Sequence, residues 1–105
     1  MQTEVLIIED LRVCFDTEEG TVRAVDGVSL TMQRGRIMGI VGESGCGKSV
    51  TSYSILQLIQ TPGRIESGSI RFYPRDGDPV EITDLDERSD PLFQIRGGKI
   101  SMIFQ

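Results

Sequence analysis

Apolar and polar residues alternate along the first third of the chain. Val5–Phe15 predicts a strand or a bent pair of strands, in which Val5 and Ile7 alternate, then Leu11, Val13 and Phe15, with Glu9-Asp10 breaking the register between the two groups. In Val22–Met32 the same spacing assigns one face to Val28, Leu30 and Met32. A period of two is typical of half-buried strands. Because the polar stretch Asp16–Thr21 carries Gly20 and reads as a turn, we expect an antiparallel pair.

The pattern then changes to a helical period. Gln33-Arg34-Gly35 turns the chain into Arg36–Val41, a short and mostly apolar run that predicts a strand. Val50–Gln60 contains no Pro or Gly, and a helix there would gather four residues on one face, Thr51, Ile55, Leu58 and Ile59. The helix is expected to end at Thr61-Pro62-Gly63, because Pro cannot continue it. Strand, glycine-rich loop and helix in this order predict a β-loop-α unit of an α/β fold.

Short apolar runs and turns fill the rest of the chain. Arg64–Tyr73 predicts a strand with apolar positions at Ile65, Ile70 and Phe72, and Ser67-Gly68 suggests a bulge or bend. The remaining elements are predicted to be a turn at Pro74–Pro79, a short strand at Val80–Ile82, a short helix from Thr83 to Ile95 interrupted or restarted at Ser89-Asp90-Pro91, a turn at Arg96–Lys99 and a buried strand at Ile100–Phe104.

The glycine-rich stretch Gly42–Ser49 matches G-x-x-x-x-G-K-[ST], the phosphate-binding loop of nucleotide hydrolases. Its glycines let the backbone approach a polyphosphate closely and adopt positive φ angles. Successive N–H groups then form a nest for anions, and the dipole of the following helix adds to the attraction. We expect Lys48 to reach the β- and γ-phosphates and the Ser49 hydroxyl to ligate Mg²⁺. The alternative is a glycine-rich turn with an incidental Lys, and the strand and helix on either side argue against it.

Composition excludes several classes of protein. The 105 residues suit one small domain, and the net charge of −5 without a basic stripe argues against a nucleic-acid partner. No apolar stretch approaches the roughly 18 residues that span a bilayer, and Met1–Glu4 does not begin a signal peptide. Cys14 and Cys46 do not make a disulfide framework, so a reducing cytosol is the natural reading. The pair is not expected to hold a metal, because there is no His and no further Cys.

The run Val5–Asp10 imitates a second signature of nucleotide hydrolases, an apolar strand that ends in magnesium-binding acids. We reject this interpretation because that strand normally follows the phosphate loop, whereas Glu9 and Asp10 precede it. They are read instead as a solvated strand end. No apolar run after Ser49 ends in Asp-Glu, so the sequence shows a nucleotide-binding element without an evident catalytic base.

These motifs together resemble the start of the ATP-binding subunit of an ABC transporter. The group that they resemble comprises the oligopeptide and dipeptide importers, together with nickel and glutathione importers, and the resemblance covers essentially the whole chain. Its landmarks are Leu11–Phe15, Arg23–Leu30, Gly39–Val50 and Ile95–Gln105. The second and fourth are specific to the group, whereas the phosphate loop alone is not.

The resemblance implies a site for ATP and Mg²⁺. The residues implied around the phosphates are Gly42, Glu43, Ser44, Gly45, Cys46, Gly47, Lys48, Ser49 and Val50. Phe15 matches the aromatic residue that stacks on adenine, with Ala24 near the same ring, and the alternative for Phe15 is a core aromatic of its strand. Gln105 matches a glutamine that touches Mg²⁺ and the attacking water and couples the site to the membrane subunits. Ser49 and Gln105 would therefore serve the metal, and Lys48 and Gln105 would support catalysis.

The implied fold is a P-loop NTPase of the α/β class, a partial ABC ATPase domain with an antiparallel β region and an incomplete parallel nucleotide-binding core. Within residues 1–105, we expect antiparallel strands at 1–35, the strand, phosphate loop and helix at 36–61, a β region and short helix at 62–98, and the strand ending in the family's glutamine at 99–105. Family chains continue past Gln105 to a signature helix, a catalytic Glu and a switch His. We therefore expect these residues to form the N-terminal part of an ATPase and to be inactive alone.

The implied function is ATP binding and, in the complete protein, ATP hydrolysis that energises import of peptides or a similar solute through an inner-membrane permease. The implied partners are the permease subunits, a second ATPase subunit and, indirectly, an external solute-binding protein, with the chain peripheral at the cytoplasmic face of the inner (plasma) membrane. An incomplete sheet would expose strand edges, so we expect the isolated chain to self-associate. Two alternatives stay open: a stand-alone nucleotide-binding module without turnover, and a chain that binds nothing because its sheet cannot hold the loop.

Overall fold

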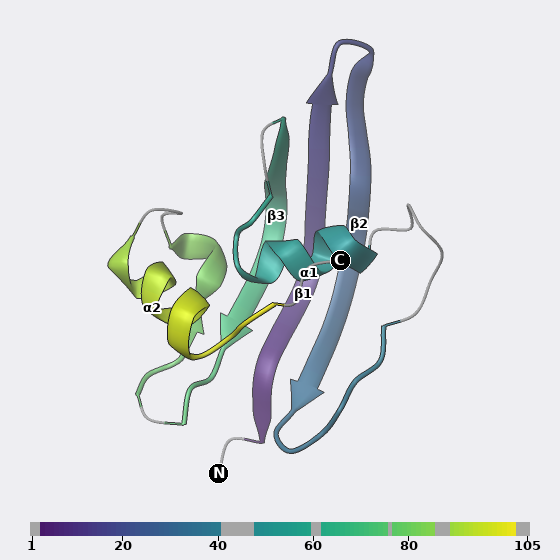
Figure 1. The fold of residues 1–105 in the computed structure, drawn as a ribbon. Coiled ribbons are helices and arrows are strands. Elements are labelled where there is room, and N and C mark those ends of the chain that lie inside the picture. The colour runs from purple at the N-terminus through teal and green to yellow at the C-terminus, as the bar shows by residue number, and fades with distance from the viewer. Residues whose placement is uncertain (1–2, 41–47, 60–61, 76, 86–88, 103–105) are drawn as a thin grey trace.

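A four-stranded antiparallel sheet organises the chain in the computed structural model, which describes residues 3–40, 48–59, 62–75, 77–85 and 89–102. The strand order is β2-β1-β3-β4, and α1 lies across one face of the sheet (Figure 1). The elements are β1 Glu4–Thr17, β2 Gly20–Gln33, α1 Lys48–Ile55, β3 Gly63–Phe72, β4 Val80–Glu81, the 3₁₀ turn η1 Ile82–Asp84 and α2 Asp90–Gly98. The antiparallel pair predicted at the N-terminus is confirmed as β1 and β2.

Bulges interrupt the three long strands at neighbouring positions. The register shifts between Ile8 and Leu11 on β1, and the backbone takes a positive φ at Asp10 (48°), at Gly27 on β2 (87°) and at Gly68 on β3 (105°). Each bulge adds one residue to its strand. The residues that face inward therefore switch between even and odd numbers from one side of the bulge to the other. The breaks predicted at Glu9-Asp10 and at Ser67-Gly68 are therefore confirmed.

The bulge on β1 decides which residues of this strand face the core. Leu6 and Ile8 are buried on the strand, followed by Leu11 and Val13, whereas Val5 and Ile7 are only half-buried. The step from Ile8 to Leu11 is three residues, and the extra residue is absorbed at Asp10. Because of the inserted residue, Leu6 and Ile8 share the face of Leu11 and Val13, which agrees with the break in register predicted at Glu9-Asp10.

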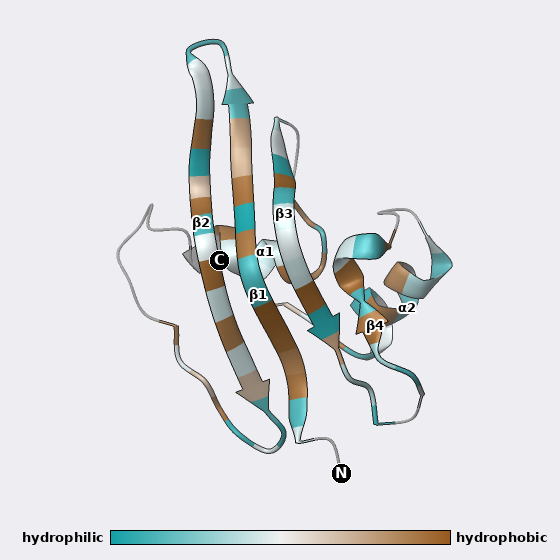
Figure 2. Cartoon of the chain, turned by 180° about the vertical axis from the view of Figure 1, so that it is seen from behind, coloured by the Kyte–Doolittle hydropathy of each residue, from teal (hydrophilic) through white to brown (hydrophobic). Residues whose placement is uncertain are grey.

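The core lies between this sheet and the two helices. Its buried members are Leu6, Ile8, Leu11, Val13, Val25, Leu56, Ile70, Phe72, Ile82, Leu92 and Ile95. The face predicted for β2 is confirmed, since Val28, Leu30 and Met32 are half-buried and pack against this core. Apolar bands alternate with polar ones along β1 and β2 (Figure 2).

Glu81 joins the short strand β4 and η1 to β3. Its carboxylate accepts hydrogen bonds from the Ser69 hydroxyl, from the Thr83 hydroxyl (2.6 Å) and from the Ile70 N–H (2.9 Å). Nε of Arg71 lies 3.8 Å from Oε1 of Glu81. Burial acts to raise the pKa of Glu81, but the three donors outweigh it and the pKa is lowered.

Two predicted strands do not form in the described residues. Residues 36–40 have no regular structure, with Ile37 fully exposed, and residues 100–102 are also irregular. All described strand pairs are antiparallel. An apolar strand of a parallel sheet needs neighbours to pair its backbone and cover its faces, and no described strand pairs with either segment. The prediction of core strands of a parallel sheet was therefore wrong for residues 36–40 and 100–102, whereas residues 41, 103 and 104 of the same predicted strands lie outside the described residues.

Helix boundaries also differ from the prediction. α1 ends at Ile55 rather than near Gln60, because Gln57 adopts a left-handed backbone (φ 53°) that stops the helix. The helix start predicted at Thr83 is the 3₁₀ turn η1, while α2 begins at Asp90 with Pro91 in its first turn, as the predicted restart requires. α2 then continues to Gly98 through part of the turn predicted at Arg96–Lys99.

Candidate functional site

The helix expected after the phosphate loop is present. α1 begins at Lys48, the seventh residue of the motif, and runs to Ile55. Val50 is half-buried and packs against the core, and its carbonyl accepts a hydrogen bond from the Ser54 hydroxyl (2.8 Å). The free N–H groups of the first turn and the positive end of the helix dipole therefore lie at the last two residues of the motif.

Several predicted site residues lie outside what the structure describes. They are Gly42, Glu43, Ser44, Gly45, Cys46, Gly47 and Gln105, together with the side chains of Lys48 and Ser49. Their roles remain predictions. The described parts of the candidate site are therefore the backbone of α1, Val50, Phe15 and Ala24.

Phe15 lies near the end of β1, where the sheet meets the segment after α1. It pairs with Val22 on β2 and with Gly63 on β3. A Cβ built on Gly63 would stand 2.5 Å from Cε1 of Phe15 and 2.7 Å from Cγ2 of Ile59, so the ring lies directly against the Gly63 backbone. Glycine is required there because any side chain would displace the ring. Phe15 is half-buried, and its ring therefore packs as a strand aromatic while part of it stays accessible.

Ala24 is half-buried on the neighbouring strand but is not the cross-strand partner of Phe15. Val13 pairs with Val25 and Cys14 pairs with Arg23, so Ala24 is the extra residue of a second irregularity in β2. The structure thus places both predicted adenine-contacting residues at the same end of the β1–β2 pair. It does not show them in direct register.

A cluster of charges covers Cys14 on the other face of the sheet. Arg64 donates to Asp16 (2.9 Å), and Arg23 donates to Glu66 (3.4 Å). The hydrogen bond from Arg64 lowers the pKa of Asp16, and that from Arg23 lowers the pKa of Glu66. Cys14 is fully buried, and its burial raises the pKa of its thiol, with a hydrogen bond to Glu66 acting in the same direction. A buried thiol of raised pKa is inert, so this cluster is structural.

The carboxylates of Glu9 and Asp10 are engaged in ion pairs, that of Glu9 with a residue of β3 and that of Asp10 with a residue of β1 itself. Glu9 pairs with Arg71 (2.9 Å), and Asp10 pairs with Arg12 (3.0 Å), which also binds Asp26. The N–H of Asp10 donates to the Ser29 hydroxyl (2.8 Å) at the bulge. These contacts give both acids a role in holding the bulged strands together.

The C-terminal end of α1 carries two side chains that the sequence reasoning missed. Nε2 of Gln57 donates to the carbonyls of Ile82 and Leu85, each at 2.6 Å. Arg96 of α2 donates through Nε to the Leu56 carbonyl (2.9 Å) and through Nη2 to the Gln57 carbonyl (3.2 Å). No period or motif marks either residue, because their partners are backbone carbonyls distant in the chain.

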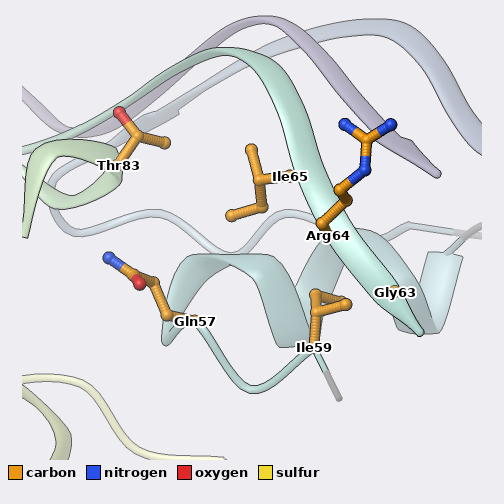
Figure 3. A pocket seen from close by; sticks show the side chains of 6 residues that line it. All are labelled: Gln57, Ile59, Gly63, Arg64, Ile65 and Thr83. Carbon is orange, nitrogen blue, oxygen red and sulfur yellow. The ribbon is translucent and has the colours of Figure 1, made fainter. Parts of the chain in front are cut away.

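A cavity of about 290 Å³ opens beside this end of the helix. It is lined by Gln57, Ile59, Gly63, Arg64, Ile65 and Thr83 (Figure 3). In Figure 3 the side chain of Gln57 extends from the end of α1 on the side of Thr83, with Ile65 between α1 and β3. The cavity adjoins the contact of Phe15 with Gly63. It therefore lies between the hydrogen bonds of Gln57 to Ile82 and Leu85 and the residue predicted to stack on adenine, Phe15.

Residues 25–105 match the model of a protein family described as ABC transporter. The chain belongs to the ABC transporter family. It is 46% identical to the oligopeptide transport ATP-binding protein OppD of Salmonella typhimurium over 100 residues, which are 95% of this chain and 28% of OppD. It is 45% identical to the dipeptide transport ATP-binding protein DppD of Bacillus subtilis over 103 residues, which are 97% of this chain and 29% of DppD. The chain therefore spans less than a third of the length of these relatives.

Membership in the ABC transporter family confirms the predicted family and the P-loop ATPase class of the fold, and it implies nucleotide binding. The antiparallel sheet of the described residues is consistent with one part of an ABC ATPase domain. Within the part of the chain that the structure describes, no helix is long and apolar enough to cross a membrane. The described residues also contain no group of three or more His, Cys, Asp or Glu side chains placed to hold a metal ion.

Proposed function

We propose that this chain binds Mg-ATP through Gly42–Ser49, and that in the complete protein ATP hydrolysis energises import of peptides or a similar solute through an ABC permease. The observation that carries the proposal is the start of α1 at Lys48, within the last two residues of a phosphate-loop motif, in a chain of the ABC transporter family. A helix N-terminus at this position supplies the unpaired N–H groups and dipole that favour a phosphate.

Each proposed contact follows from the chemistry of its side chain. The loop amides and Lys48 hold the phosphates, while the Ser49 hydroxyl and the Gln105 amide oxygen serve Mg²⁺ as neutral oxygen ligands. Phe15 stacks on the adenine ring, with Ala24 near it. The accessible part of the half-buried Phe15 ring, held against Gly63, supports this role because a stacking platform needs a fixed orientation.

The partners we propose are permease subunits, a second ATPase subunit and, indirectly, an external solute-binding protein, with the chain peripheral at the cytoplasmic face of the inner (plasma) membrane. The names of OppD and DppD refer to oligopeptide and dipeptide transport, and this similarity supports a peptide as the solute. A polyphosphate site of this kind performs no turnover alone, because hydrolysis also requires a group that positions the attacking water.

We also propose that the isolated chain self-associates. β2 is a long strand at the edge of the sheet, and Val22, Ile37, Met38 and Ile40 expose apolar side chains. Unpaired strand edges and exposed apolar side chains both favour pairing with another chain. Sedimentation should show a mass that rises with concentration, and a constant monomer mass would contradict this.

The test of the proposed site is a series of ligands that differ in the number of phosphates. ATP and ADP should displace a fluorescent ATP analogue in the presence of Mg²⁺, whereas adenosine should not, because the loop recognises phosphates rather than the base. In Ser49→Ala the affinity for ATP should lose its dependence on Mg²⁺. Equal displacement by adenosine and ATP would refute a phosphate-binding loop.

A further inference from the structure

The C-terminal end of α1 is closed by backbone hydrogen bonds that leave two carbonyls facing outward. The Gln57 N–H donates to the Ser54 carbonyl (3.0 Å), and the Leu58 N–H donates to the Tyr53 carbonyl (2.8 Å). These two bonds are the Schellman arrangement, in which the residue after the cap has a left-handed backbone. They leave the carbonyls of Leu56 and Gln57 for partners outside the helix.

Gln57 occupies a backbone conformation that normally selects Gly or Asn. Its φ of 53° costs free energy for a side chain of this size. Its amide group donates to the carbonyl of Ile82, the first residue of η1, and to that of Leu85, which follows η1, each at 2.6 Å. A glycine would remove the strain but also both contacts, so the strained residue is explained by the link that its side chain makes.

Arg96 completes the link from the opposite side. Its Nε and Nη2 donate to the carbonyls of Leu56 and Gln57, and its positive charge lies at the negative end of the α1 dipole. The guanidinium reaches both carbonyls at once because its donors form a planar fork, which the single ammonium of a Lys cannot reproduce. Arg96 therefore ties the last turn of α1 to the last turn of α2.

The segment after α2 is anchored at the same place. The N–H groups of Lys99 and Ile100 both donate to the carbonyl of the buried Ile95, at 3.1 and 2.9 Å. α1 has only eight residues and is therefore about 12 Å long, so its two ends cannot move independently. A displacement of its first turn would be transmitted through Arg96 to α2 and to the chain leading toward Gln105.

We propose that Gln57 and Arg96 are positioning residues that hold α1, and with it the phosphate loop, in the orientation that binds nucleotide, and that couple this orientation to α2. This inference rests on the proposed function. It assigns no chemical step to either residue, because the side chain of Gln57 contacts carbonyls at η1 and that of Arg96 contacts carbonyls at the end of α1.

The test measures amide hydrogen exchange in α1 and α2 of the full chain, with and without Mg-ATP. In the unsubstituted protein, Mg-ATP should slow exchange in both helices. In Arg96→Met the slowing should persist in α1 and disappear in α2, and the dissociation constant for Mg-ATP should rise by at least about fivefold. Arg96→Lys should show the same losses of affinity and of slowed exchange in α2, but only in part. Arg75→Met, a change at an exposed arginine in a turn, should behave as the unsubstituted protein.

Gln57→Gly separates positioning from stability. Removing the strain at φ 53° should keep or raise the melting temperature, while the affinity for Mg-ATP falls because the link to η1 is lost. A purely structural role predicts that affinity and melting temperature change together. This variant keeps the test decisive if Arg96→Met does not fold.

The outcomes distinguish the two proposals. Absence of any binding of Mg-ATP to the unsubstituted protein would overturn the proposed function, and this inference with it. Binding with no change of exchange in α2, or with the same change in Arg96→Met, would overturn only the positioning role.

Discussion

Gly68→Ala tests the row of bulges that sets the inward face of the sheet. Gly68 has a φ of +105°, and a Cβ placed there would stand 2.6 Å from the Asp10 carbonyl oxygen and 2.6 Å from Cα of Leu11. Both are backbone atoms at the bulge of β1, so neither can rotate away. The substitution must therefore shift one strand against the other.

The magnitude follows from two separable terms. A side chain at this φ costs about 1–3 kcal/mol of backbone strain, and relieving an overlap with a packed backbone costs about 1–3 kcal/mol more. Gly20→Ala is the matched control, because Gly20 has a φ of +126° and nothing lies within 4 Å of its Cβ position. We expect a loss of about 4 kcal/mol for Gly68→Ala and about 2 kcal/mol for Gly20→Ala.

Urea unfolding followed by circular dichroism measures both variants. The free energy of unfolding of a small domain falls by about 1–3 kcal/mol for each 1 M of urea. The urea midpoint of Gly68→Ala should therefore lie about 1 M below that of Gly20→Ala. Equal midpoints for the two variants would refute the claim that the bulges of β1 and β3 are in close backbone contact.

Three further predictions concern charges and the buried thiol. Glu81→Ala should lower the free energy of unfolding by about 2–3 kcal/mol, because three donors lose a charged acceptor. Glu18→Ala, at the exposed β1–β2 turn, should change the free energy of unfolding by less than about 0.5 kcal/mol. Equal losses in the two variants would contradict this role of Glu81. The pKa of Glu66 and that of Glu81 are lowered by folding, so their contribution is present above the ordinary carboxyl range and is lost as pH falls through the lower folded values. Urea midpoints should therefore fall as the pH is lowered below about 5, and less steeply in Glu81→Gln, while a flat profile would refute the sign. Cys14, buried and of raised pKa, should react with iodoacetamide only on unfolding, and rapid labelling of the native chain by peptide mass spectrometry would refute its burial.

The sequence predicted those features of the fold that depend on local chemistry. The antiparallel pair β1–β2 follows from a period of two around a turn at Gly20, and the bulges at Asp10 and Gly68 follow from a broken register and an isolated glycine. The start of α1 at Lys48 follows from the phosphate-loop motif, whose spacing requires a helix behind the last glycine.

Features that depend on partners distant in the chain were not predicted. Residues 36–40 have the composition of a buried strand, but a strand also needs a neighbour to pair with, and composition does not reveal whether one is present. The end of α1 at Ile55 depends on Gln57, whose left-handed backbone is stabilised by the carbonyls of Ile82 and Leu85 about 25 residues later. Neither contact leaves a periodic signal in the sequence.

The measurement that most directly tests the central claim is isothermal titration of the full chain with Mg-ATP, beside its Lys48→Ala and Lys99→Ala variants. These are the two lysines of the chain, and Lys99 is exposed after α2. We predict one ATP bound per chain in the unsubstituted protein and in Lys99→Ala, and no detectable binding in Lys48→Ala. Binding of equal strength in Lys48→Ala would contradict the assignment of Gly42–Ser49 as the phosphate-binding loop.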